Sequence, residues 1–196
     1  MLGATARNAT GAHFVKSEVR IVGGQWKRSK LPVAERPGLR PTPDRVRETL
    51  FNWLGQDLSG WRVLDAFAGS GALGFEAASR GAAEVLLIES DTTLVRSLAA
   101  VKARLLADAA QVIAADALTW LARCAPARFE LVLLDPPFDA NLFDAALAAA
   151  APAVVPGGFL YLEAPREFTA APAAFTRHRH LRAGAVHAHL FVRGEG

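Results

Sequence analysis

The chain has 196 residues, 52% of them hydrophobic, and a mass of 20.8 kDa. This length fits one domain that buries about 70% of its unfolded surface, so no disulfide or structural metal is needed. The lone Cys124 excludes an internal disulfide framework and a multi-cysteine zinc site. Residues 1–20 lack a continuous apolar core, and proline and glycine interrupt the uncharged stretch 145–162. We therefore expect a soluble, cytoplasmic protein with no membrane partner.

The net charge of +3 is unevenly distributed along the chain. Residues 1–47 hold ten of the 22 Lys and Arg residues but only three of the 19 Asp and Glu residues. A basic N-terminal part on a mildly acidic body indicates a polyanionic partner. Residues 1–17 show no hydrophobic period and are predicted to be a disordered tail.

Residues 18–58 are predicted to form a small, basic extension made of a β-hairpin and a helix. Short apolar runs at 19–22 and 30–33 are typical of two paired strands. Thr42 and Pro43 have the pattern of an N-cap followed by a first-turn proline. The helix after them is expected to bury one face, formed by Val46, Leu50, Trp53 and Leu54.

Strands and helices alternate through residues 59–196, which we expect to form the main domain. The apolar run 131–134 is typical of a parallel sheet covered on both faces. The pattern predicts an α/β fold: a Rossmann-like, doubly wound, mostly parallel seven-stranded sheet with an antiparallel closing strand. The predicted strands are 61–67, 84–89, 111–114, 129–135, 158–163, 175–181 and 185–192, and the helices 72–80, 92–107, 117–123 and 141–151.

Polar clusters follow four of these strands, where such sheets bind their ligands. Gly69, Gly71 and Gly74 form a G-x-G-x-x-G pattern between a strand and a helix. Glu89 stands 20 residues after Gly69, at the end of the next strand, where an acid can bind ribose hydroxyls. This spacing indicates a cofactor that contains a ribose.

Asp65 indicates which ribose-containing cofactor is bound. A carboxylate is unfavourable beside a pyrophosphate but suits an ammonium group. S-adenosylmethionine carries an ammonium, a sulfonium, a ribose and an adenine, and Asp116 could accept from the adenine amine. Alternatively, Asp65 caps the following turn and Asp116 caps a helix. The residues predicted to bind this cofactor are Asp65, Phe67, Ala68, Gly69, Ser70, Gly71, Glu89, Ser90, Asp116 and Ala117.

The most specific cluster is Asp135-Pro136-Pro137-Phe138, which ends an apolar strand. Two prolines remove two backbone donors and stiffen the turn, which leaves carbonyl groups free to accept. The Asp135 side chain and the Pro136 carbonyl could both accept from one exocyclic amine, while Phe138 stacks on a flat base. These four residues are predicted to be catalytic; the alternative is a purely structural turn.

These motifs resemble the class I S-adenosylmethionine-dependent methyltransferases that methylate exocyclic amines. More closely, residues 18–193 resemble the bacterial 16S rRNA guanine-N2 methyltransferase family. The shared text is RIVGGQW at 20–26, LRPTPDRVRETLFNWL at 39–54, DAFAGSGALG at 65–74 and DPPF at 135–138. The resemblance implies methyl transfer to N2 of a guanine in 16S rRNA, during assembly of the 30S particle.

The expected mechanism is direct displacement, in which the guanine amine attacks the sulfonium-bound methyl group without a covalent enzyme intermediate. The basic N-terminal part fits an RNA partner. Trp26 is expected to pack the hairpin on the domain, and the protein is expected to be a monomer. The residues predicted to bind RNA are Arg20, Lys27, Arg28, Lys30, Arg40, Thr42, Arg45 and Arg47.

Other interpretations stay open. A nicotinamide-dependent oxidoreductase explains the glycines and Glu89 but not the 135–138 cluster, and a non-enzymatic RNA-binding assembly factor explains only the basic residues. Adenine-N6 DNA and glutamine-N5 protein methyltransferases also use a Pro-Pro-aromatic pocket. The pairs His178/His180 and His187/His189 each share a strand face in a regular strand, and we favour a solvated or RNA-facing strand over a metal site.

Overall fold

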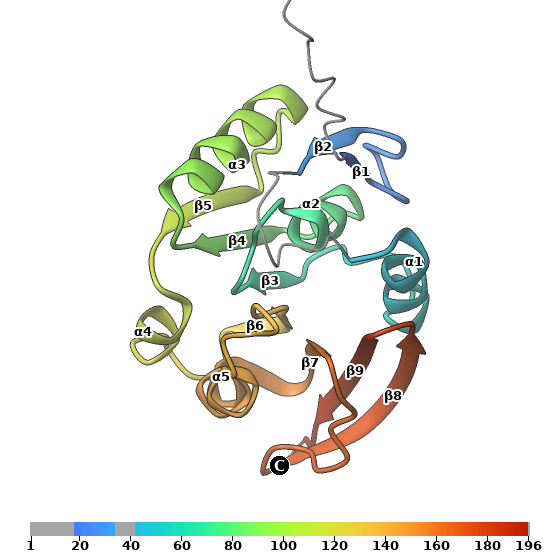
Figure 1. Ribbon diagram of the computed structural model, residues 1–196, viewed down its shortest axis with the longest axis vertical. Helices are drawn as coiled ribbons and strands as arrows, with labels where there is room; N and C mark the ends of the chain where they lie inside the picture. Colours follow the sequence, from blue (N-terminus) through green and yellow to red (C-terminus); the bar gives the residue numbers. More distant parts are fainter. Residues whose placement is uncertain (1–17, 34–41, 196) are drawn as a thin grey trace, which may run out of the picture.

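A seven-stranded sheet forms the centre of the molecule, shown in Figure 1 as a computed structural model that describes residues 18–33 and 42–195. The spatial order of the strands is β5-β4-β3-β6-β7-β9-β8. All neighbouring pairs are parallel except those of β9, which runs antiparallel between β7 and β8. The strands are β3 (Arg62–Asp65), β4 (Glu84–Glu89), β5 (Ala110–Ala114), β6 (Phe129–Leu134), β7 (Val154–Ala164), β8 (Phe175–Ala183) and β9 (Val186–Arg193).

Helices cover both faces of this sheet (Figure 1). Helices α1 (Asp44–Trp53), α2 (Ala72–Ser79) and α3 (Thr92–Leu105) lie on one face. Helices α4 (Ala117–Leu121) and α5 (Phe143–Ala150), with the 3₁₀ turn Ala151–Ala153, lie on the other.

Side chains alternate along each strand, so Leu133 joins the core on the α2 side and Leu134 the core on the α5 side. The predicted doubly wound α/β fold is confirmed, including its antiparallel closing strand. Within the described ranges, no helix has both the length and the apolar character needed to cross a membrane.

The predicted N-terminal hairpin is present as β1 (Glu18–Arg20) and β2 (Lys30–Pro32). Its Val19 and Leu31 are buried in the same core as the α2 face of the sheet, and Trp26 packs against that core. The extension over 18–58 therefore shares its core with the sheet, and its separation as a domain stays a prediction. The predicted tail over 1–17 lies outside the described residues.

The turn between the hairpin strands is locked onto the end of α2. Ser79 Oγ donates to the Gly23 carbonyl oxygen at 2.7 Å and accepts from the Trp26 amide at 2.9 Å. Gly24 has a φ of 72°, and a Cβ atom there would lie 1.9 Å from the Ser79 carbonyl oxygen. Only glycine fits this approach, so the Gly23-Gly24 pair serves docking as well as the turn.

A buried carboxylate joins the hairpin and α1 to α2. Glu76, fully buried in α2, accepts from the Val22 amide at 2.8 Å and lies 3.3 Å from the Arg47 guanidinium. Its other oxygen receives the Arg80 guanidinium at 2.9 Å. Arg47 is also fully buried, and its Nε donates to the Thr42 carbonyl oxygen at 3.3 Å. The network therefore holds three segments together through one charged group.

Removing this carboxylate should leave the buried Arg80 guanidinium without its counter-charge, and should leave the buried Arg47 with only the more exposed Asp44 as its acidic partner. We expect Glu76→Ala to lower the free energy of unfolding by about 3–5 kcal/mol, as is usual when one partner of a buried ion pair is lost. Urea unfolding followed by circular dichroism measures this loss.

The matched control is Glu18→Ala, which breaks the exposed Lys30–Glu18 ion pair. Such a surface pair contributes about 0–1 kcal/mol, so this variant should stay close to the wild type. Equal effects of the two substitutions would contradict the anchoring role of Glu76.

Candidate active site

The parallel sheet brings the predicted acids to one edge. Asp65 ends β3, Glu89 ends β4, and Asp135 follows β6, the neighbour of β3 on its other side. A small pocket of about 50 Å³ lies at this edge. Seven of the predicted site residues line it, together with Ala72 and Leu73: Thr42, Asp65, Phe67, Ala68, Gly69, Ser70 and Asp135.

The glycine loop is held tightly against the strands. The Gly69 amide donates to Glu89 at 2.9 Å, and the Gly71 amide donates to the Ala68 carbonyl oxygen at 2.6 Å. Gly71 has a φ of 78°, and a Cβ atom there would lie 2.5 Å from the Phe75 ring. Gly71 is therefore a packing requirement of the loop and is itself buried.

Asp65 has an unused acceptor at the pocket. It is 1% exposed, and its Oδ2 accepts from the Gly74 amide at 2.9 Å, which is the turn-capping role considered as the alternative. Its Oδ1 makes no hydrogen bond of normal geometry among the described residues, although the nearby Phe67 amide lowers the pKa of this side chain. Burial raises the pKa of Asp65 to about 7, against the Gly74 hydrogen bond and with help from the Glu89 charge. A buried acceptor without a partner is costly, so the site suits a cationic donor.

Glu89 and the residues after β5 lie outside this pocket. Glu89 is half-buried, and its two oxygens accept from the Gly69 and Asp91 amides. Asp116 is exposed and caps α4 by accepting from the Thr119 amide at 2.8 Å, which lowers its pKa. Ser90 is exposed and Ala117 buried. The helix-capping alternative for Asp116 is therefore what the structure shows, and its contact with adenine stays a prediction.

The Asp135-Pro136-Pro137-Phe138 turn places a carboxyl group and an aromatic ring at the rim of the site. Asp135 is half-buried and Pro136 buried, whereas Pro137 is exposed. Phe138 is 37% exposed and packs edge-on against Phe143, with ring centroids 6.1 Å apart. Burial, together with the charges of Glu163 and Asp65, raises the pKa of Asp135 well above its usual value.

The structure corrects two predictions on the segment before α1. Thr42 was expected to cap the helix, but Pro43 occupies the cap position and no side chain caps it. Thr42 is instead buried and lines the pocket together with Asp135. Arg47 was expected to contact RNA, but it is fully buried against Glu76 and offers no surface to a phosphate.

Most of the remaining basic residues do lie on the surface. Arg20, Lys27, Arg28, Lys30 and Arg45 are exposed, and Lys30 pairs with Glu18 at 2.7 Å. Arg40 lies outside the described residues. Trp26 is half-buried against the core, as its predicted packing role requires.

Sequence reasoning missed Glu163, a buried acid near the end of β7. It is 2% exposed and accepts from the Tyr161 hydroxyl at 2.9 Å. Burial raises the pKa of Glu163 to about 7. Glu163 stands at the end of an apolar run, beside the strand that leads to Asp135. The sequence could have indicated it, because the strand-end rule had selected the other acids.

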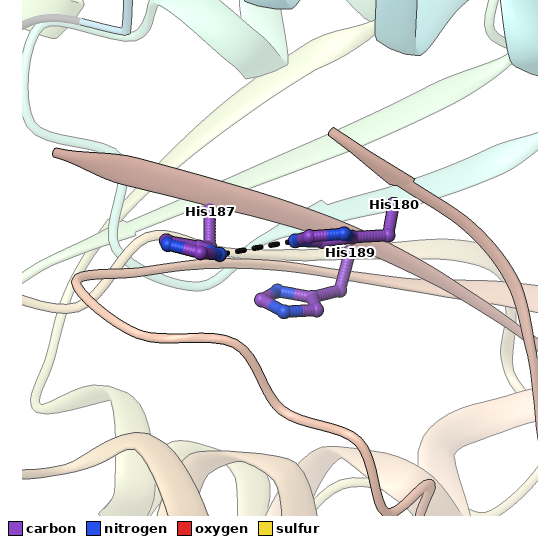
Figure 2. A group of neighbouring side chains, drawn as sticks. All are labelled: His180, His187 and His189. Atoms are coloured by element: carbon purple, nitrogen blue, oxygen red, sulfur yellow. Dashed lines mark hydrogen bonds between the residues drawn. The ribbon is translucent and has the colours of Figure 1, made fainter. Parts of the chain in front are cut away.

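β8 is mostly exposed and His178 lies on its surface, as expected, whereas His189 on β9 differs from the expectation of a solvated strand. His189 is fully buried, its Nε2 accepts from the Phe168 amide at 2.9 Å, and its Nδ1 lies 3.2 Å from the Leu162 carbonyl oxygen. Burial lowers the pKa of His189 to about 4. Figure 2 shows His180 and His187 hydrogen-bonded to each other at 3.1 Å, with His189 beside them. Since both ring nitrogens of His189 are engaged, a three-histidine metal site would have to break one of these bonds.

The predicted shared face of His178 and His180 is wrong. The pairing of β8 with β9 shifts between Arg177 and Arg179. His178 then contacts Phe159, while His180 stacks on His189 with ring centroids 4.8 Å apart. A bulge of this kind turns successive side chains to different faces, which sequence spacing alone does not show.

A second, larger cavity shares no lining residue with the smaller pocket. Its volume is about 730 Å³, and it lies between α5 and the segment that precedes β8. None of the predicted site residues lines it. The predicted site residues instead line the smaller pocket, where polar side chains from distant parts of the chain lie close together.

Comparison with known proteins identifies relatives over most of the chain. Residues 19–192 match the family model described as Conserved hypothetical protein 95. The chain is 40% identical over 185 residues to "Ribosomal RNA small subunit methyltransferase D" of Escherichia coli strain K12, covering 92% of this chain and 93% of the relative. The Haemophilus influenzae protein of the same name is 46% identical over 138 residues, covering 68% and 70%.

The fold is also that of a solved relative. The Escherichia coli structure named "Putative methyltransferase yhhF" is 37% identical, with a TM-score of 0.82 over 92% of this chain and 100% of that one. The chain therefore belongs to the Conserved hypothetical protein 95 family and to that of the ribosomal RNA small subunit methyltransferases D, and it is a methyltransferase.

Proposed function

We propose that this chain transfers a methyl group from S-adenosylmethionine to the N2 amine of a guanine in 16S rRNA. The observation that carries the proposal is the convergence of Asp65 and Asp135 on one pocket, because one suits a cation and the other an amine. The relatives named ribosomal RNA small subunit methyltransferase D support rRNA as the substrate. We further propose that the protein acts in the cytoplasm, as a monomer, on an assembling 30S particle.

The residues present fit S-adenosylmethionine. The unpartnered Oδ1 of Asp65 would accept from the ammonium group of its amino acid part. Glu89 would bind the ribose hydroxyls, since each carboxylate oxygen that accepts one backbone amide has a second lone pair. Asp116 is exposed at the start of α4, where it would accept from the adenine amine. When bound, the cofactor supplies an electrophilic methyl group on a sulfonium.

The 135–138 turn would orient the target amine. Asp135 and the Pro136 carbonyl oxygen would each accept a hydrogen bond from one N–H of this amine. The nitrogen lone pair would then point toward the methyl group. Phe138 is exposed at the rim and would stack on the guanine ring. Most of the rate enhancement then comes from orientation, with Asp135 stabilising the positive charge that develops on nitrogen.

The exposed basic residues would bind the rRNA backbone. They lie on the hairpin and at the start of α1, which are joined to α2 through Glu76. Thr42 lies two residues before the start of α1 and lines the pocket. RNA bound along this surface would therefore lie next to the site where the amine must enter. The residues proposed for these phosphate contacts are Arg20, Lys27, Arg28, Lys30 and Arg45, with Arg40 carried over from the sequence alone.

Asp65→Asn should weaken S-adenosylmethionine binding by about 10- to 100-fold, because it removes one charged hydrogen bond and keeps the shape of the side chain. In the wild type, affinity should fall as pH drops below about 7, where Asp65 takes up a proton and no longer attracts the ammonium. Isothermal titration calorimetry across this pH range measures both effects.

The exposed Asp108 provides the matched control for this charge change. Asp108→Asn should bind the cofactor with wild-type affinity and wild-type pH dependence. If Asp65→Asn behaved in the same way, Asp65 would not be the ammonium ligand.

Asp135→Ala should lower kcat for methyl transfer by at least about 100-fold, as expected for a lost electrostatic contact at the reacting group. S-adenosylmethionine affinity should stay within about threefold of wild type. Transfer of a radiolabelled methyl group to undermethylated 30S particles measures the first quantity, and calorimetry the second. Asp139→Ala, four residues further along and exposed, is the control; normal turnover by Asp135→Ala would refute the mechanism.

A further inference from the structure

The edge strand β8 carries positive charge that the proposed function does not use. β8 stands at one end of the strand order, so one of its edges is unpaired within the described ranges. Its nine residues include the exposed Arg177, Arg179 and Arg182 but no Asp or Glu. The other residues from 48 to 196 hold nine Lys and Arg against 16 Asp and Glu. A basic strand on an acidic domain indicates a polyanionic partner.

Two of these arginines have no acidic partner in the described part of the chain. Arg177 pairs with Glu167 at 2.5 Å. Arg179 and Arg182 donate only to nearby backbone carbonyl oxygens, at 3.0 and 3.3 Å. A carbonyl group carries no net charge, so both guanidinium groups present a full positive charge to a ligand that brings negative charge.

The register of the sheet places Arg182 at the edge that carries the candidate active site. Ala164, the last residue of β7, pairs with His187 of β9, and His187 pairs with Arg182. Asp135 follows β6, the parallel neighbour of β7, at the same edge. Neighbouring strands are about 4.8 Å apart, so the three steps from β6 to β8 span about 14 Å. A stacked nucleic acid strand advances about 3.4 Å per phosphate, so about four nucleotides cover this distance.

Arg166 lies on the way, because it follows the end of β7 by two residues. Its guanidinium carbon lies 3.9 Å from the centroid of the Phe168 ring. Its one acidic partner in the described ranges is Asp144, at 3.5 Å, and the two side chains are 60% and 82% exposed. An exposed pair of this kind is weak, so the guanidinium can exchange Asp144 for a phosphate.

A row of aromatic rings holds Arg166 near the rim of the site. Phe168 contacts Phe143, and Phe143 contacts Phe138, with ring centroids 6.0 and 6.1 Å apart. Phe138 is the side chain proposed to stack on the target guanine. A guanine that enters the pocket must leave its own stack, so the nucleotides next to it are bound as a single strand. Their phosphates would pass Arg166.

We propose that Arg166 and Arg182, with Arg179 further along β8, form a phosphate-binding surface for the single-stranded rRNA that flanks the target guanine. The RNA would cross the strand ends from the 135–138 turn to β8. β8 contacts α1, and Figure 1 shows the turn between β8 and β9 beside that helix, so the surface lies next to the basic N-terminal part. This proposal rests on the proposed function and extends the rRNA contact to the C-terminal strands.

Arg166→Gln and Arg182→Gln each remove one charge from an exposed position, so both variants should fold normally. We expect each to weaken binding of a single-stranded RNA of about 12 nucleotides, with guanine at its centre, by about three- to tenfold at low salt. The slope of log Kd against log salt concentration should decrease by about 0.7 for each lost phosphate contact. Fluorescence anisotropy of the labelled RNA measures both quantities.

Two controls separate a phosphate contact from an effect on the fold or on net charge. Arg182→Lys keeps the charge and should bind the RNA within about twofold of the wild type. Arg96→Gln removes an exposed charge from α3, which contacts β5 at the other end of the strand order, and should bind like the wild type. Equal losses in Arg96→Gln and Arg182→Gln would overturn the proposal.

The length of the RNA tests its path across the protein. Removing the flank that crosses to β8 should weaken binding by the wild type and erase its difference from Arg182→Gln. Removing the other flank should leave that difference in place. A difference that survives both truncations would show that Arg182 does not contact a flank, and would also overturn the proposal.

Methyl transfer to undermethylated 30S particles distinguishes this proposal from the proposed function. Both glutamine variants should raise KM for the particle by about three- to tenfold and keep kcat and S-adenosylmethionine affinity. No methyl transfer by the wild type, with RNA binding that still depends on Arg182, would refute the proposed function but not the surface. Methyl transfer with unchanged RNA affinity in both variants would refute the surface alone, and a raised KM in that case would indicate an acidic protein as the partner instead.

Discussion

The buried Glu76 carboxylate is the contact on which the rest of the structure depends. It receives the Val22 amide from the hairpin and the guanidinium groups of Arg47 and Arg80. Arg47 in turn donates a hydrogen bond to the carbonyl oxygen of Thr42, a residue that lines the pocket. One interaction therefore connects the basic N-terminal surface to the strand ends. The basic N-terminal part, which we propose to bind RNA, is thus anchored by an acid of the main domain.

The site itself is defined by three neighbouring carboxyl groups. Asp65, Asp135 and Glu163 approach one another on the α2 side of the sheet, and burial raises the pKa of all three. Arg47 is the cation that opposes this effect on Glu163. Such a site favours ligands that bring positive charge or hydrogen-bond donors. A cofactor with an ammonium and a sulfonium, and a substrate with an exocyclic amine, would supply both.

Sequence periodicity and strand-end position predicted the sheet, the helices and most of the pocket, because these features depend on local pattern and on a general rule of parallel sheets. The outcomes that pattern could not predict depend on which partner a side chain meets. In the sequence, Arg47 has the pattern of a surface arginine, and only the fold places Glu76 opposite it. Thr42 has the pattern of a helix cap, and only the fold places it beside Asp135 in the pocket. His189 is buried because β9 lies inside the sheet, between β7 and β8.

The central claim is that this chain methylates the N2 amine of a guanine in 16S rRNA. Mass spectrometric mapping of 16S rRNA from cells with and without the gene tests it most directly. We expect that one N2-methylguanine disappears when the gene is deleted and returns with the wild-type chain, but not with Asp135→Ala. An N2-methylguanine pattern that is identical in both strains would contradict it.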